Sequence, residues 1–166
     1  MDQAVSANTQ PAMAEEAQVE LYYGRSRRGI EASFRLLVPK EWRTEGGPSQ
    51  FMILPWPLEN EHYDYLLVLP MSRCAGVLDD LKKRSHTDEQ AADFKRVIGS
   101  SCKKVAFDRF GRLALSESLL RDAGITDEAE LVGCVDHFEI WNPSKYEAAK
   151  LAHKKSAAEI KKGVFI

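Results

Sequence analysis

The sequence predicts an α+β protein with two related β-rich halves and a helical connection between them. Residues 31–43 and 108–121 each contain an acidic residue, three further residues, an arginine and an apolar strand-like run. Two other segments, 68–74 and 140–146, also correspond to each other. Between the halves, apolar residues change to the spacing of one helical face. These observations indicate that a half-domain is repeated.

Size and composition are those of one globular domain. The chain has 166 residues, of which 44% are hydrophobic, enough to bury a core. The net charge of −2 argues against an overall electrostatic attraction to nucleic acid. Basic residues nevertheless gather locally: residues 25–43 and residues 145–162 each hold six basic residues against two acidic ones. Local surfaces for phosphate groups are therefore expected.

Cysteine spacing and the N-terminal residues indicate an intracellular protein. The three cysteines are far apart and odd in number, so no disulfide framework or zinc-binding pair is expected. The N-terminal residues lack the basic and apolar regions of a signal peptide. No apolar stretch has the length needed to span a bilayer. We therefore expect a cytoplasmic protein.

The first half is expected to consist of short strands after a disordered leader. Residues 1–18 are rich in Ala, Gln and Glu and show no periodicity, which favours disorder. A basic segment bounded by Gly24 and Gly29 follows the first strand, and Pro39 suits the first turn of a short helix. The four expected strands cover residues 19–23, 34–38, 51–54 and 65–69.

Two helices are expected to connect the halves, over residues 74–84 and 88–100. The apolar residues of the first helix recur at the spacing of one helical face: Val77, Leu78 and Leu81. Thr87 is the expected N-cap of the second helix. The halves of the domain then span about residues 19–84 and 88–146.

The second half repeats the β-rich pattern and ends in a basic tail. Its expected strands cover residues 104–107, 112–115, 130–134 and 137–141. Ser116 is the expected N-cap of a short helix through Asp122, which Gly124 closes. Pro143 is expected to end the barrel-like part. Residues 147–166 form a lysine-rich helix or tail, with an amphipathic helix expected from Ala148 to Lys162.

The turn D-R-F-G-R at residues 108–112 has the residue types of a ligand-binding loop. Gly111 can supply a positive φ, and Asp108 can accept backbone N–H bonds across the turn. The Arg112 guanidinium would emerge at the base of the loop, where it can bind a phosphate or a guanine edge. The alternative is that Asp108 and Arg112 pair with each other and only hold the turn.

A family resemblance covers about residues 21–146. Two runs of the second half carry it, V-A-F-D-R-F-G-R-L-A-L-S-E-S-L-L-R-D-A-G-I (105–125) and A-E-L-V-G-C-V-D-H-F-E-I-W (129–141). Both closely resemble MraZ, a family of bacterial transcriptional regulators of the division and cell-wall gene cluster. The first half matches more loosely, through Y-Y-G (22–24), E-A-S-F-R-L-L-V-P-K-E-W-R (31–43), Y-L-L-V-L-P (65–70) and F-K-R-V-I-G-S (94–100).

The resemblance implies two tandem swapped-hairpin β-barrel half-domains of the AbrB-like fold, joined by helices. It also implies that the chain assembles with itself into a ring-like homo-oligomer, which would bind repeated promoter boxes by avidity. The family contacts double-stranded DNA through the acid-x-x-x-arginine loop of each half. By position, these loop residues are Glu31, Arg35, Asp108, Gly111 and Arg112. The neighbouring arginines are further candidates: Arg25, Arg27, Arg28 and Arg109.

The first loop departs from the family pattern. Phe34 stands where the family has a glycine, and Ser33 and Phe110 stand where it has lysines. A bulky residue does not adopt a left-handed conformation readily, so the first loop is expected to have a different shape. The missing positive charges are expected to lower phosphate affinity and salt sensitivity.

The sequence therefore predicts a sequence-selective DNA-binding regulator at the nucleoid, with no enzymatic activity and no cofactor. One alternative is an AbrB-like protein-interaction module with weakened DNA binding, which Phe34 and the net acidic charge favour. The other is a hydrolase or metal enzyme. Cys134 and His137 are three residues apart with no third ligand expected nearby, which favours a buried thiol and a surface histidine over a metal site.

Overall fold

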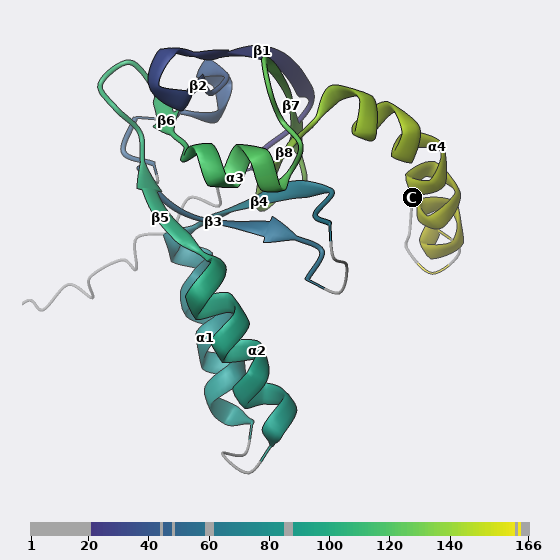
Figure 1. Ribbon diagram of the computed structural model, residues 1–166. Helices are drawn as coiled ribbons and strands as arrows, with labels where there is room; N and C mark the ends of the chain where they lie inside the picture. Colours follow the sequence, from purple (N-terminus) through teal and green to yellow (C-terminus); the bar gives the residue numbers. More distant parts are fainter. Residues whose placement is uncertain are drawn as a thin grey trace, which may run out of the picture.

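The computed structural model describes residues 21–43, 45–47, 49–58, 62–84, 88–161 and 163. In this part of the chain, eight strands form one antiparallel sheet that curves into a near-barrel (Figure 1). The strands are β1 (Arg25–Glu31), β2 (Arg35–Leu37), β3 (Gln50–Trp56), β4 (Tyr65–Pro70), β5 (Lys103–Ala106), β6 (Arg112–Ala114), β7 (Glu128–Gly133) and β8 (Phe138–Trp141). The helices are α1 (Met71–Lys83), α2 (Glu89–Ser101), α3 (Glu117–Asp122) and α4 (Pro143–Lys161), with 3-10 turns at Ala32–Phe34 and Lys40–Trp42.

The sheet nearly closes on itself. Neighbouring strands follow the order β5–β3–β4–β8–β7–β1–β2–β6. The two outer strands meet at a bridge between Phe107 and Leu113, so little of either edge is left unpaired. The predicted α+β class is confirmed. None of the helices in the described residues is long and apolar enough to cross a membrane.

Strands from the two halves of the chain pair with each other in the sheet. Strand β1, from the first repeat, pairs with β7 from the second through five residue pairs. Strand β5, from the second repeat, pairs in turn with β3 from the first through four pairs. At the centre, β4 and β8 pair with each other. Neither repeat therefore completes a sheet without the other.

The short pair of β2 and β6 joins the repeats at the site of interest. Leu36 lies opposite Leu113, and both side chains are fully buried. The remaining pairs of this ladder are Arg35 with Ala114 and Leu37 with Arg112. Because each strand starts at the arginine of its acid-x-x-x-arginine loop, this register brings the two loops to neighbouring positions.

Two further backbone bonds extend the ladder into the loops in a reciprocal way. The carbonyl of Phe34 accepts from the N–H of Leu115 at 2.9 Å, and the carbonyl of Gly111 accepts from the N–H of Val38 at 3.1 Å. Phe34 and Gly111 each precede the arginine of their loop. The two loops are therefore held by equivalent bonds in the two repeats.

An aromatic cluster fills one end of the core. The Phe138 ring contacts Trp42 at 5.2 Å, Tyr22 at 5.3 Å and Phe51 at 5.7 Å, measured between ring centroids. Such pairs stabilise a core by about 0.5–1.5 kcal/mol beyond the area they bury. The Trp42 Nε1–H donates to the Tyr23 carbonyl at 2.9 Å, so the buried indole is satisfied.

Strand β1 corrects the prediction for the N-terminal part of the domain. The basic segment bounded by glycines was not expected to be a strand, yet Arg25–Glu31 form one. Its side chains alternate between exposed and half-buried, so charged residues occupy its outer face. The expected strand over residues 19–23 is wrong where it is described, since Tyr22 makes only an isolated bridge with Val135, and residues 19 and 20 lie outside the described residues.

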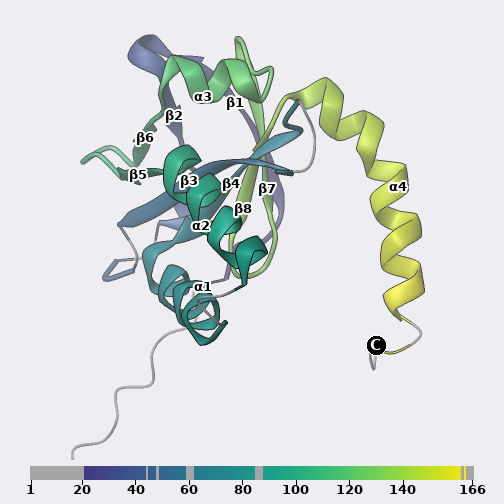
Figure 2. The ribbon, with the colours of Figure 1, turned by 60° about the horizontal axis from the view of Figure 1, so that its bottom comes forward.

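The helices agree with the predicted pattern but differ at their ends. Helices α1 and α2 form a hairpin that projects from the sheet (Figures 1 and 2). The Asp88 side chain accepts from the Ala91 N–H and caps α2, whereas the predicted cap, Thr87, lies outside the described residues. Helix α4 begins at Pro143, five residues earlier than expected, because Asn142 Oδ1 accepts from the N–H groups of its first turn.

We expect opposite effects of alanine at two glycines. In Gly133→Ala the new Cβ would lie 2.5 Å from the Tyr22 carbonyl oxygen, so the variant should lose about 1–3 kcal/mol of unfolding free energy. Gly76 lies inside α1 with open space around it, so Gly76→Ala should gain about 0.5–1 kcal/mol. Urea unfolding measures both free energies. An unchanged unfolding free energy in Gly133→Ala would contradict the close contact between Gly133 and the Tyr22 backbone.

Candidate nucleic-acid interface

The acid and arginine of each loop are paired across the two repeats. We call residues 31–35 loop 1 and residues 108–112 loop 2. The Arg112 Nε–H of loop 2 donates to Glu31 Oε2 of loop 1. In the reverse direction, Arg35 Nη1 of loop 1 lies 3.6 Å from Asp108 Oδ2 of loop 2. The ion pairs are therefore crossed between the loops. Asp108 and Arg112 also pair within loop 2, as the alternative expected, but through the Arg112 backbone N–H, which donates to Asp108 Oδ1.

Loop 2 is a turn organised by the Asp108 carboxylate. Asp108 Oδ1 accepts from the backbone N–H of Phe110 at 2.8 Å and of Arg112 at 3.0 Å. Gly111 has φ 79°, the left-handed conformation that the sequence predicted there. The backbone N–H of Arg112, then that of Phe110, and the guanidinium groups of Arg112 and Arg35 keep the pKa of Asp108 below its ordinary value. The carboxylate therefore stays ionised.

Arg43 holds loop 2 from the first repeat, a role that the sequence did not predict. Its Nε–H donates to the Val38 carbonyl at 3.0 Å, and its Nη1 donates to the Phe110 carbonyl at 3.3 Å. The guanidinium lies directly over Gly111, where a Cβ would collide with it. A glycine in loop 2 thus provides both the positive φ and the space for Arg43.

Loop 1 also has left-handed backbone, but at residues other than glycine. Phe34 has φ 57° and Ser33 has φ 59°. The prediction that Phe34 avoids the left-handed conformation is therefore wrong. Left-handed backbone at a non-glycine residue costs about 1–3 kcal/mol, which the backbone bond from Leu115 and the crossed ion pairs help to offset. The two loops still differ, because loop 1 has a second left-handed residue.

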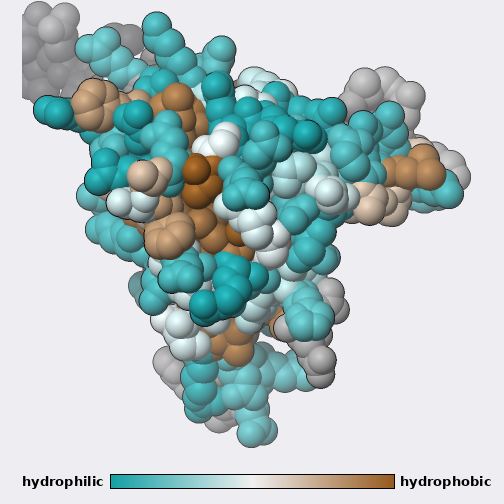
Figure 3. All heavy atoms as spheres, turned by 45° about the horizontal axis from the view of Figure 1, so that its top comes forward, coloured by the Kyte–Doolittle hydropathy of each residue, from teal (hydrophilic) through white to brown (hydrophobic). Residues whose placement is uncertain are grey.

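The surface between the loops is mixed in character. A shallow depression of about 460 Å³ lies between them, lined by Glu31, Ala32, Ser33, Arg35, Phe110 and Arg112. The Phe110 ring is 52% exposed and lies 4.6 Å from the guanidinium carbon of Arg109 and 5.1 Å from that of Arg112. Phe34 is 42% exposed on loop 1. Figure 3 shows apolar side chains gathered among hydrophilic ones on the face it draws.

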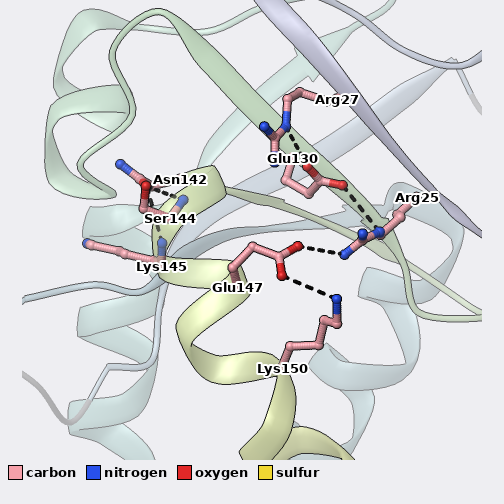
Figure 4. Close-up of polar contacts among 8 residues, drawn as sticks. All are labelled: Arg25, Arg27, Glu130, Asn142, Ser144, Lys145, Glu147 and Lys150. Carbon is pink, nitrogen blue, oxygen red and sulfur yellow. Dashed lines mark hydrogen bonds and ion pairs between the residues drawn. The ribbon is translucent and has the colours of Figure 1, made fainter.

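Arginines of the basic segment in β1 pair with acidic residues of β7 and α4. Glu130, only 4% exposed, accepts from Arg27 Nε at 3.0 Å and lies 3.5 Å from Arg25 Nε. Arg25 also donates to Glu147 of α4 at 3.1 Å (Figure 4). The Arg28 Nε is buried and has no hydrogen-bond partner among the residues that the structure describes. Acidic residues thus engage Arg25 and Arg27, and phosphate binding by this segment stays a prediction.

Comparisons with known proteins find similarity to MraZ proteins. A family model described as "MraZ protein, putative antitoxin-like" matches residues 100–163, which include loop 2. The chain is 29% identical to the transcriptional regulator MraZ of Lactobacillus delbrueckii subsp. bulgaricus over 127 residues, covering 76% of this chain and 85% of that relative. The chain is therefore similar to MraZ proteins over about three quarters of its length.

Other MraZ proteins match a similar share of the chain. The transcriptional regulator MraZ of Clostridium tetani is 28% identical over 127 residues, covering 76% of this chain and 85% of that relative. The transcriptional regulator MraZ of Rickettsia felis is 26% identical over 144 residues, covering 82% and 95%. All three relatives are named transcriptional regulators, and the resemblance to MraZ proteins predicted from the sequence is confirmed.

The left-handed backbone of Gly111 and Phe34 predicts different effects of substitution in the two loops. Gly111→Ala should lower the unfolding free energy by about 1–3 kcal/mol, because it adds left-handed strain and displaces Arg43. The reciprocal change, Phe34→Gly, removes strain and should leave the unfolding free energy unchanged or raise it by up to about 1 kcal/mol. Urea unfolding of both variants checks this. A larger loss for Phe34→Gly than for Gly111→Ala would show that the loop geometry is wrong.

Proposed function

We propose that the chain regulates transcription by sequence-selective binding of double-stranded DNA through loops 1 and 2, most directly at promoters of division and cell-wall genes. The crossed ion pairs carry the proposal, because they hold Arg35 and Arg112 on one surface in a reciprocal arrangement. An approximate two-fold arrangement of this kind suits the two-fold symmetry of duplex DNA. The MraZ relatives, named transcriptional regulators, support the same role. Such a protein would act in the cytoplasm, at the nucleoid.

The fold that we propose for this role is a pair of interleaved swapped-hairpin halves. The exchange of β1 and β5 between the repeats supports it, as does the reciprocal register of β2 and β6. In such a body the two arginine loops cannot separate without opening the sheet. We further propose that several copies form a ring, so that many loops contact repeated DNA boxes and avidity raises the overall affinity.

Within this proposal the arginines and the acidic residues of the loops have different roles. Arg35 and Arg112 have planar guanidinium groups that can bind a phosphate or the O6 and N7 atoms of guanine with two hydrogen bonds. Glu31 and Asp108 orient these groups in the free protein and compete with phosphate for them. Arg109, exposed beside Phe110, adds positive charge at the tip of loop 2.

A protein-interaction module with weak DNA binding is the second candidate. It is favoured by the exposed rings of Phe34 and Phe110 on the loop surface, since apolar side chains on such a surface are typical of protein contacts. The acidic partners of both arginines also lower the positive charge that the loops offer to DNA. The two candidates differ in what removal of the arginines does.

A salt titration of DNA binding tests the proposal. The wild type and the variant Arg35→Ala/Arg112→Ala are titrated with the duplex upstream of the protein's own gene and with a scrambled duplex of equal length. Arg96→Ala is the matched control, because Arg96 is an exposed arginine on α2 and pairs with Asp93. Each lost phosphate contact should reduce the slope of log affinity against log salt by about one unit.

The expected result is that the wild type and Arg96→Ala prefer the native duplex, and that the double variant loses this preference. If the wild type binds both duplexes equally well, loop-based sequence selection at this promoter is contradicted. If the double variant keeps the preference, the arginines are not the DNA-reading groups and the interaction-module alternative is favoured.

A further inference from the structure

The tip of the β7–β8 hairpin brings together three metal-ligating side chains. The ligand atoms of Cys134, His137 and Glu139 all lie within 4.8 Å of one another, and the three residues are half-buried. The sequence analysis expected no third ligand beside Cys134 and His137, and the structure corrects this. His137 directly precedes β8, and Glu139 is the second residue of that strand. This cluster is not part of loops 1 and 2.

Surrounding residues orient the cluster in the way that metal sites require. The Nδ1 atom of His137 lies 2.8 Å from Asp136 Oδ1, which leaves Nε2 directed to the cluster. The Trp141 Nε1–H donates to Glu139 Oε2 at 2.7 Å, which leaves Oε1 at 3.7 Å from His137 Nε2. A carboxylate on the outer nitrogen of a ligating histidine is a recurrent outer-sphere contact of zinc sites.

We propose that Cys134, His137 and Glu139 bind a divalent transition-metal ion of the zinc type, with water as the fourth ligand. Sulfur, nitrogen and oxygen ligands in tetrahedral sites lie at about 2.0–2.3 Å from zinc, so the ligand atoms are about 3.3–3.8 Å apart. The His137–Glu139 separation is already in this range. The ion needs only small movements of side chains that are already adjacent.

Charge and rigidity also suit a divalent cation. A thiolate from Cys134 and the carboxylate of Glu139 supply two negative charges in the first coordination sphere, which balance the ion. The outer carboxylate, Asp136, is balanced by Arg73, whose Nη2 lies 3.5 Å from it. The hairpin is closed by a bond from the Cys134 N–H to the His137 carbonyl at 2.9 Å, so two ligands are fixed by backbone structure.

Cobalt(II) is the probe, because its spectrum reports the ligands directly. The full chain, treated with a chelator and freed of it, is titrated with Co²⁺ under reducing conditions. The wild type should show a sulfur-to-cobalt charge-transfer band and the visible bands of tetrahedral cobalt, saturating at one ion per chain. Zinc should displace the cobalt and raise the melting temperature, because the ion binds the folded state.

Variants assign the band to the cluster. Cys134→Ser should abolish the charge-transfer band, whereas Cys102→Ser, a matched change at another half-buried cysteine, should retain it. Asp136→Asn, which alters only the outer contact, should keep the band and weaken cobalt affinity about 10- to 100-fold. Glu139→Gln should weaken cobalt affinity at least as much. Circular dichroism establishes that each variant is folded.

The proposal is overturned by any of three results. The wild type can fail to give the charge-transfer band, in which case the cluster is a metal-free hydrogen-bond network. The band can persist in folded Cys134→Ser, or it can disappear in Cys102→Ser. Should Cys134→Ser fail to fold, unchanged cobalt affinity in folded Glu139→Gln and Asp136→Asn overturns the site equally.

Discussion

The pairing of β2 with β6 is the constraint on which the rest of the structure depends. Three residue pairs, centred on buried Leu36 and Leu113, join the repeats where their functional loops begin. The sheet needs this contact to approach closure, since β6 also meets the end of β5. Loss of the pair would open the near-barrel and separate the two arginines. Packing of the core and geometry of the surface site are therefore set by the same short ladder.

The crossed ion pairs fix how the two loops lie relative to each other, but they add little to the stability of the fold. Exposed ion pairs contribute roughly 0–1 kcal/mol, so Glu31 and Asp108 are better explained by orientation than by stability. Each acid orients the arginine of the other repeat, but it must also release that arginine when phosphate binds. In the proposed function, this competition lowers DNA affinity and raises the dependence on correct geometry, which favours selectivity over tight nonspecific binding. The left-handed backbone at Phe34 likewise costs stability, and it persists because surrounding contacts hold it.

Features that depend on residues close in the sequence could be predicted, whereas contacts between residues distant in the sequence could not. The Ser116 cap, the positive φ of Gly124 and the β7–β8 hairpin follow from residues a few positions apart. Strand β1 was missed because its outer face is charged and its pairing partner lies in the other repeat. The crossed pairs and Arg43 depend on that same long-range register, which no local pattern encodes. Glu139 could have been found, since it follows His137 by two residues in the sequence.

The central claim, that each acid positions the arginine of the other repeat, is tested most directly by Glu31→Gln. The quantity measured is the ratio of affinities for the native and scrambled duplexes, in Glu31→Gln, Arg112→Ala and the double variant. Loss of a negative charge alone would strengthen binding to both duplexes and leave the ratio unchanged. Positioning predicts instead that Glu31→Gln lowers the ratio, and that the double variant equals Arg112→Ala alone because both changes remove one interaction. An unchanged ratio in Glu31→Gln, or effects that multiply in the double variant, would contradict the account.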